Sequence, residues 1–298
     1  MLTDVITAFE QNTGIFVFCV ALLGLMIGSF LNVVIYRLPL MMQRDWACEC
    51  RDLLEDELDP KKIEKDTLPE NFSLALPASS CPNCQHKITL LENIPVISWL
   101  MLRGKCSSCK TKISARYPII EAVTAILSVV VALHFGVTWQ TLAVLPLTWA
   151  LISLTLIDFD HMILPDQITL PLIWLGLLIN LNGLFVPLED AVIGAMAGYM
   201  SLFSVYWLFK LVTGKEGMGF GDFKLMAVFG AWLGWQLLPI LILMASVVGA
   251  IVGISMVLFS GHKRDNAIPF GPYIAVAGWI TLLWGQSIWQ WYLSFLGY

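Results

Sequence analysis

Long apolar stretches alternate with short polar turns along most of this chain. Eight of the stretches have about the 17–25 residues that a helix needs to cross a bilayer. We expect membrane-spanning helices at residues 14–36, 119–136, 140–157, 167–184, 191–211, 223–240, 241–260 and 271–293. One long polar region, residues 37–118, interrupts them. We see no internal repeat and none of the inverted halves that many transporters have. The pattern predicts an all-α polytopic membrane protein with about eight transmembrane helices and one polar insert.

Three domains follow from this pattern. They are a first transmembrane helix (1–36), the insert (37–118) and a seven-helix membrane domain (119–298). The composition agrees, because 58% of the residues are hydrophobic and 13% are charged, whereas soluble domains have about 25% charged residues. No basic segment precedes the first apolar run, so we expect no cleavable signal. The mild acidity gives no reason to expect a nucleic-acid partner.

The basic residues set the orientation of the chain in the membrane. With eight spans and the N-terminus outside, all 17 Lys and Arg residues fall on one side, including Lys61, Lys62, Lys65, Lys263 and Arg264. The opposite side carries none, in the loops 136–140 and 185–190 and the tail after 293. By the positive-inside rule, the insert faces the cytoplasm and both termini lie on the far side.

The insert contains two Cys-x-x-Cys pairs, "CPNC" at 81–84 and "CSSC" at 106–109. Each pair presents two sulfurs from one tight turn, so Cys81, Cys84, Cys106 and Cys109 predict a four-thiolate zinc site. Four protein ligands leave no open position, which indicates a structural metal. Two disulfides or buried thiols are the alternative, and the reducing cytoplasm argues against disulfides. Iron in a rubredoxin-like site is the minor alternative.

Two other features of the insert leave alternatives open. Cys48 and Cys50 lie in an acidic stretch at a spacing that fits a zinc site poorly, so we interpret them as spare thiols on a hydrated surface. The acidic run is the alternative contact for a basic substrate segment. The segment "ENIPVISWLMLRGK" at 92–105 is mostly apolar with a few polar groups. It is typical either of a ligand site near the membrane or of packing on the zinc site.

Acidic residues are rare at the span ends and therefore informative. Asp158 and Asp222 lie at similar depth at the inner ends of two spans, where we expect them to meet across a helix interface. Two adjacent carboxylates share one proton. One then acts as a base on a water molecule while the other polarises a scissile carbonyl. Glycines before Asp222, among them Gly219 and Gly221, allow close backbone approach and a hinge.

Other interpretations of these acids stay open at this point. Asp166 follows Pro165 and is expected to cap the fourth span, and Asp160 is expected in a solvated turn. A proton relay or a structural role is the alternative for Asp158 and Asp222.

An ordered set of motifs resembles the bacterial type IV prepilin peptidases, which are bifunctional leader peptidases and N-methyltransferases. The set comprises "GSFLNVVIYRLP", the two cysteine pairs, "ENIPVISWL" with "RGKC", "RYPIIE", "DFDHMILPD", "GMGFGDFKL" and "IPFGPY". In the second aspartate motif, Gly219 and Gly221 precede Asp222, and Lys224 follows it. A lone Gly-x-Gly-Asp is weak, but this order along nearly the whole chain is specific.

The resemblance implies an enzyme of the bacterial inner membrane. Such enzymes cleave the basic leader of type IV prepilins and of type II secretion pseudopilins at the cytoplasmic face. They then methylate the new N-terminal residue, usually phenylalanine, with S-adenosylmethionine. By analogy Asp158 and Asp222 are the catalytic pair of an aspartic endopeptidase. Gly104 matches a glycine tied to methylation in the family, and we add Glu92 and Arg103 as groups for the amine and carboxylate of the cofactor.

Two other functions compete with this prediction. A proton-coupled transporter would use the acids as a relay, although transporter sites usually lie near the midplane. A non-catalytic assembly factor for a pilus or a secretion machine would use zinc only to shape a docking domain. The sequence does not indicate the oligomeric state or which pilins are processed.

Overall fold

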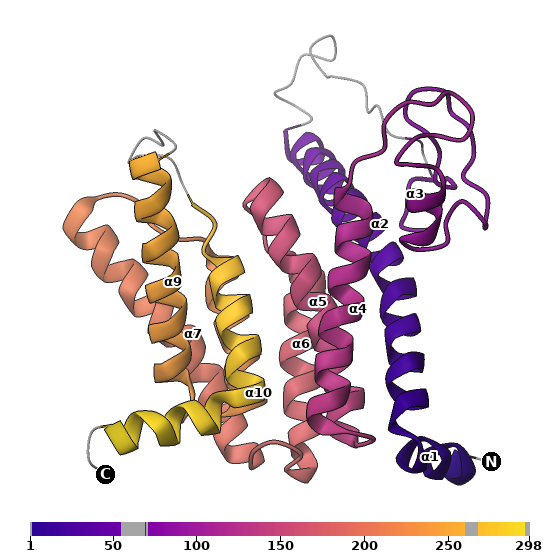
Figure 1. Ribbon diagram of the computed structural model, residues 1–298. Helices are drawn as coiled ribbons and strands as arrows, with labels where there is room; N and C mark the ends of the chain where they lie inside the picture. The colour runs from indigo at the N-terminus through magenta and orange to yellow at the C-terminus, as the bar shows by residue number, and fades with distance from the viewer. Residues whose placement is uncertain (1, 55–68, 70, 260–267, 296–298) are drawn as a thin grey trace. The chain divides into compact units, whose positions relative to one another are not determined.

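The computed structural model describes residues 2–54, 69, 71–259 and 268–295. Within those residues the regular structure is helical apart from two isolated β-bridges, which confirms the all-α expectation (Figure 1). The helices are α1 (Leu2–Gln11), α2 (Thr13–Leu53), α3 (Ile97–Met101), α4 (Arg116–Phe135), α5 (Trp139–His161), α6 (Asp166–Ile179), the 3₁₀ turn η1 (Asn180–Asn182), α7 (Leu188–Thr213), α8 (Phe220–Leu233), α9 (Leu238–Phe259) and α10 (Gly271–Phe295).

Five helices of the described chain are long and apolar enough to cross a membrane, namely α2, α4, α5, α7 and α9. Each of the other three expected spans also coincides with a helix, but none meets both requirements. α6 and α8 have 14 residues each, and α10 has 25 residues with a less apolar composition. The chain is therefore a multi-pass membrane protein.

The first span runs farther than expected. α2 has 41 residues and continues through Pro39 to Leu53, whereas the apolar pattern ends at residue 36. The buried Arg37 lies at this exit. Its guanidinium donates hydrogen bonds to the carbonyl oxygens of Ser73 at 2.8 Å and Pro77 at 2.7 Å. The start of the polar insert is thereby held against the helix.

Some of the predicted features lie outside the described residues. They are the basic residues Lys61, Lys62, Lys65, Lys263 and Arg264 and the last part of the acidic run, from residue 55 onward.

The contacts divide the chain into two compact units, residues 14–129 and residues 1–13 with 130–298. In the first unit, α2 and α4 pack closely at Gly24 and Gly28. A Cβ on these glycines would lie 2.8 Å and 2.7 Å from the Cα atoms of Ala125 and Glu121. Small residues at such a crossing allow two membrane helices to approach each other.

In the second unit, the short helix α8 is the core. It packs against α6, α7 and α10, and Phe223, Phe229 and Trp232 are fully buried. The Trp232 indole donates a hydrogen bond to the Leu172 carbonyl of α6 at 2.9 Å. α8 is short and enclosed, so the residues at its N-terminus are held in place from several sides.

Candidate functional site

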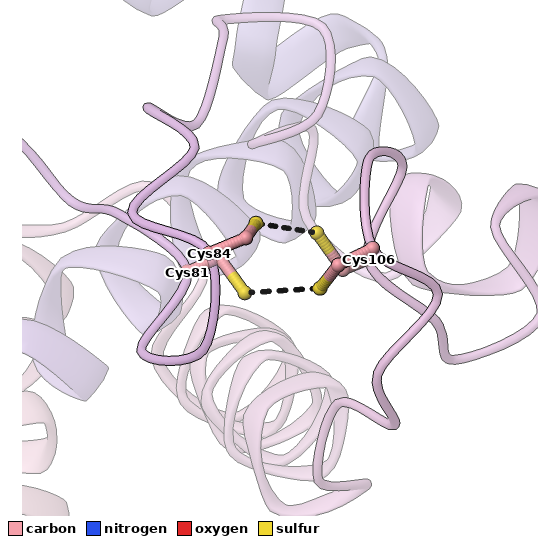
Figure 2. A group of neighbouring side chains, drawn as sticks. Cys81, Cys84 and Cys106 are labelled. Atoms are coloured by element: carbon pink, nitrogen blue, oxygen red, sulfur yellow. Dashed lines mark hydrogen bonds between the residues drawn. The ribbon is translucent and has the colours of Figure 1, made fainter.

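The two cysteine pairs come together at one point of the insert. The four Sγ atoms of Cys81, Cys84, Cys106 and Cys109 all lie within 4.8 Å of one another. The Sγ atoms of Cys81 and Cys109 are 3.7 Å apart, and those of Cys84 and Cys106 are 4.0 Å apart. Figure 2 shows the side chains of Cys81 and Cys84 pointing toward that of Cys106. A tetrahedral zinc site with Zn–S bonds of about 2.3 Å has sulfurs about 3.8 Å apart. The cluster therefore fits a zinc ion, and disulfide bonds would need far shorter S–S distances of about 2.05 Å.

The surroundings of the sulfurs also suit a metal. Hydrogen bonds with the side chain and backbone of Thr111, and then with Asn83, lower the pKa of the Cys109 thiol to about 5. The backbone of His86 favours the Cys84 thiolate, but burial and the neighbouring sulfurs raise the pKa of Cys84 to about 11. A bound cation removes this conflict, because it stabilises all four thiolates together.

Each knuckle is built the same way, as a short repeat of one turn. The Cys81 N–H donates to the His86 carbonyl at 2.9 Å, and the Cys106 N–H donates to the Thr111 carbonyl at 2.9 Å. The β-bridges Ser80–Lys87 and Lys105–Lys112 close the two turns. The repeat is visible in the sequence as "CPNCQHKI" and "CSSCKTKI", but it is too short to register as a repeat of whole structural units.

The segment between the knuckles is held by Glu92 and Gly104. The Glu92 carboxylate accepts hydrogen bonds from the backbone N–H of Thr89 at 2.8 Å and from its hydroxyl at 2.9 Å, and it pairs with His86 at 3.2 Å. Hydrogen bonds from the Ser107 hydroxyl and from Thr89 lower the pKa of Glu92 to about 2. This carboxylate therefore fastens the loop between the two knuckles.

Gly104 has a packing reason to be glycine. Its φ is +66°, and a Cβ there would lie 2.8 Å from the indole of Trp99. That indole donates a hydrogen bond to the Ile113 carbonyl at 3.2 Å. Arg103 is exposed beside it and also has a positive φ of 54°.

The second cluster contains the two aspartates, Asp158 and Asp222, which come from the ends of two helices. Asp158 lies in the last turn of α5 and Asp222 in the first turn of α8. Their side chains are buried, since the residues are 5% and 7% exposed, and their carboxyl groups are close enough to interact electrostatically. The two acids thus approach each other, as the sequence predicted. A buried pair of this kind is unusual without a chemical role.

One atom of this pair stands out. The Oδ2 atom of Asp158 is buried and has no hydrogen-bond partner among the described residues. The backbone of Gly271, the first residue of α10, approaches the same carboxyl group. A Cβ on Gly271 would lie 2.6 Å from that Oδ2 atom. A polar atom so placed is set to bind a water molecule or a substrate group.

Gly271 and Leu164 are site residues that the sequence interpretation did not single out. Leu164 is buried between Gly221 and Gly271, and a Cβ on either glycine would come within about 3 Å of it (2.8 Å and 3.1 Å). Gly271 lies in the motif "IPFGPY" and Leu164 in the motif "DFDHMILPD", but neither motif indicates these contacts. Gly221 lies inside α8, so packing against Leu164, in place of the expected hinge, is its role in this structure.

An ion pair joins the two aspartate motifs. The ammonium of Lys224, two residues after Asp222, contacts both carboxylate oxygens of Asp166 at 2.7 Å. Asp166 is the first residue of α6, with Pro165 at the N-cap, so the expectation that Asp166 caps this helix was wrong. Asp160 is exposed, as expected, but it lies in the last turn of α5 and not in a turn after the helix.

Comparison with known proteins agrees with both clusters. Residues 22–135 match the model of the Bacterial Peptidase A24 N-terminal domain, and residues 145–254 match the Type IV leader peptidase family. The chain is 60% identical over 275 residues to a protein of Aeromonas salmonicida, covering 92% of this chain and 93% of that one. It is 56% identical over 283 residues to a protein of Pseudomonas aeruginosa, covering 95% of each chain. Both relatives are named prepilin leader peptidase/N-methyltransferase.

The chain belongs to the type IV leader peptidase family. A protein of Neisseria gonorrhoeae with the same name is 50% identical over 277 residues, covering 92% of this chain and 93% of the relative. No solved structure matches the chain. The stretch that matches the first family model includes the four cysteines, and the stretch that matches the second includes Asp158 and Asp222. The two clusters therefore lie in separately recognised parts of the family.

Proposed function

We propose that this chain is a bifunctional enzyme that removes the leader of prepilins and methylates the N-terminus thus exposed. The relatives carry both activities in their name, and they match the chain over nearly its whole length. The observation that carries the peptidase assignment is the buried, interacting pair Asp158 and Asp222 with one unpartnered oxygen.

In this proposal the two carboxyl groups divide the acid–base work of hydrolysis. One, as the carboxylate, takes a proton from a water molecule while the water oxygen bonds to the scissile carbonyl carbon. The other, in the acid form, donates a hydrogen bond to the carbonyl oxygen. The carbon–nitrogen bond then breaks, and the leaving amine takes up a proton. The unpartnered Oδ2 of Asp158 beside Gly271 supports this assignment, because such an oxygen is available to water or substrate.

The membrane topology supports the same site. We propose eight crossings, by α2 and α4 to α10, in the bacterial inner membrane, with both termini in the periplasm. In this arrangement the last turn of α5 and the first turns of α8 and α10 all lie at the cytoplasmic face. α6 and α8 are about 21 Å long, which is short of a bilayer core of about 30 Å. α8 is enclosed by other helices, so it need not present a full span to lipid.

For methyl transfer we propose the insert, residues 37–118, as the domain that binds the methyl donor. Zinc held by the four cysteines is structural here, since all four positions are filled by protein. S-adenosylmethionine, when bound, supplies the methyl group to the exposed amine. Glu92 and Gly104 hold the segment between the knuckles in shape, and Arg103 is exposed on it. We propose that Arg103 contacts the carboxylate of the donor and that Glu92 and Gly104 present it.

Mass spectrometry of a purified prepilin, incubated with the enzyme with and without S-adenosylmethionine, tests both activities. We expect loss of the leader in both cases and gain of one methyl group only with the donor. The variant Asp158→Asn should leave the prepilin intact but still methylate a pilin whose leader was removed beforehand. Cleavage by this variant at the wild-type rate would rule out the catalytic pair. A folded enzyme that leaves the prepilin unchanged would favour the assembly-factor alternative.

A further inference from the structure

The zinc-binding insert carries a row of exposed apolar side chains between its two knuckles. Leu90 is 91% exposed, Leu91 77% and Met101 78%. We call the set the apolar edge, and its members are Leu90, Leu91, Ile94, Ile97, Leu100 and Met101. A small polar module does not gain stability from exposing so many large apolar groups, and contiguous groups of this kind mark contact surfaces.

The middle of the apolar edge is fastened to a membrane helix. The backbone N–H of Val96 donates a hydrogen bond to the Oε2 atom of Glu121 in α4 at 2.7 Å. Val96 has a φ of 60°, which is a strained conformation for a β-branched residue. Glu121 is itself buried, with its Cα against Gly28 of α2. The contact therefore fixes the height of the apolar edge along the two membrane helices.

Along both helices, this contact lies deeper in the span than the basic residue at the cytoplasmic end. Glu121 follows Arg116, the first residue of α4, by five residues, or about 7.5 Å at 1.5 Å per residue. Gly28 precedes Arg37 by nine residues, or about 13 Å. Basic residues flank spans at the level of the lipid head groups. In Figure 1, α3 is accordingly drawn beside the first turns of α4 and not beyond its end.

The charge of the same part of the chain matches a lipid surface. Residues 81–118 contain one acid, Glu92, whose carboxylate pairs with His86 and accepts hydrogen bonds from Thr89. They contain six basic residues, which are Lys87, Arg103, Lys105, Lys110, Lys112 and Arg116. Segments that combine an apolar face with excess Lys and Arg bind anionic membrane surfaces, with their apolar side chains about 5–10 Å deep.

We propose that the apolar edge is seated in the surrounding bilayer, at the boundary between head groups and acyl chains, and that the lysine side chains of residues 81–118 contact anionic head groups. The insert is then a membrane-embedded module and not a domain that projects freely into the cytoplasm. This inference needs only the membrane spans α2 and α4, so it does not depend on either proposed activity.

Fluorescence quenching in lipid nanodiscs tests the proposal on the full-length protein. A small fluorescent amino acid, introduced by stop-codon suppression, leaves all seven cysteines in place. It replaces Leu91 or Met101 in two proteins and Ser108, an exposed residue of the second knuckle, in a matched control. The nanodiscs contain phosphatidylethanolamine and phosphatidylglycerol, with spin-labelled lipids as membrane quenchers and iodide as the aqueous quencher. Bound zinc and prepilin cleavage confirm that each labelled protein is folded.

We expect spin labels near the head groups to quench the probe at Leu91 and Met101 severalfold more than at Ser108, and iodide to show the reverse order. Replacing phosphatidylglycerol with phosphatidylcholine should weaken the lipid quenching. Equal exposure of all three probes to iodide would overturn the proposal. Protection from both quenchers would mean that another part of this chain covers the edge. Protection that appears only with added prepilin would assign the edge to the substrate. Each of these two kinds of protection would also exclude the lipid contact.

Discussion

Replacing Gly271 with alanine should damage peptide cleavage while leaving the fold intact. A Cβ at this position would lie 2.6 Å from Oδ2 of Asp158 and 3.1 Å from a methyl group of Leu164. A carbon and an oxygen in contact are normally about 3.3 Å apart or more, so the carboxylate must shift by about 0.7 Å. Misplacement of a reacting group by about 1 Å can cost roughly 100-fold in rate. We therefore expect Gly271→Ala to lower kcat for leader cleavage by about 100-fold, or about 2.7 kcal/mol.

The effect on the free energy of unfolding should be small, because two contributions oppose each other. Alanine in place of glycine lowers the entropy of the unfolded state, which favours folding by about 0.4–1 kcal/mol, and local crowding at Leu164 opposes this gain. The variant should therefore keep the wild-type Tm within a few degrees. It should also keep methylation of a pilin without its leader, because the proposed methylation module is a separate unit.

Initial rates of leader removal, measured by mass spectrometry at saturating prepilin, give kcat for the comparison. Gly253→Ala is the matched control, since its Cβ would meet only Ile268 at an ordinary 3.6 Å. It should cleave at the wild-type rate. If Gly271→Ala also cleaved within about threefold of wild type, a difference of roughly 0.7 kcal/mol in the barrier, then Oδ2 of Asp158 would not lie at the reacting centre. A large fall in Tm would instead attribute any loss of activity to misfolding.

Three further predictions address the zinc cluster, the ion pair and the loop between the knuckles. Cys106→Ser should reduce bound zinc, measured by elemental mass spectrometry, and abolish methylation; full zinc occupancy would contradict the four-thiolate site. Lys224→Met should lower cleavage about two- to fivefold, because the partly exposed pair with Asp166 is worth about 0.5–1 kcal/mol. The exchange Asp166→Lys with Lys224→Asp should restore most of the loss, and failure of this rescue would show that Lys224 acts in another way. Glu92→Gln should lower the thermal transition of the insert by the same amount at all pH values between about 5 and 8. The pKa of Glu92 is about 2 in the folded protein, so its carboxylate stabilises the fold fully above the unfolded pKa of about 4.5 and loses this effect only as the pH falls toward 2. A loss confined to part of that pH range would contradict this account of Glu92.

Features that depend on local spacing were predictable from the sequence. Two sulfurs in one Cys-x-x-Cys turn are placed by the turn itself, so only the meeting of two turns had to be inferred, and Cys81 and Cys106 indeed share one cluster. Apolar runs likewise predicted a helix at each expected span. Their ends were harder to predict, because side chains from elsewhere decide them. Asn180, for example, ends α6 by bonding to the carbonyl oxygen of Ala231 and to the backbone N–H of Phe185.

Features that depend on contacts between distant residues were not predictable. The approach of Gly271 to Asp158 joins residues 113 positions apart, and hydropathy contains no information about it. Glu92 shows the same limit. As a lone acid in an apolar segment it was interpreted as a ligand group. Its partners Thr89 and His86 lie within six residues of it, but Ser107 reaches it only when the second knuckle folds against the first. The prediction that Glu92, Arg103 and Gly104 serve the methyl donor stays a prediction.

The arrangement of helix ends explains why the acids can be placed accurately at a membrane surface. Asp158 ends a helix that runs toward the cytoplasmic face in the proposed topology, and Asp222 begins one that runs away from it. Their backbones therefore belong to rigid elements, and Leu164, between Gly221 and Gly271, fills the space where these elements meet. Loops at the same face would not hold the two carboxyl groups together, since burial of two acids side by side is unfavourable. Helix ends packed around α8 resist separation of the two carboxyl groups. Burial can therefore keep Asp158 and Asp222 close together while a peptide bond enters the site.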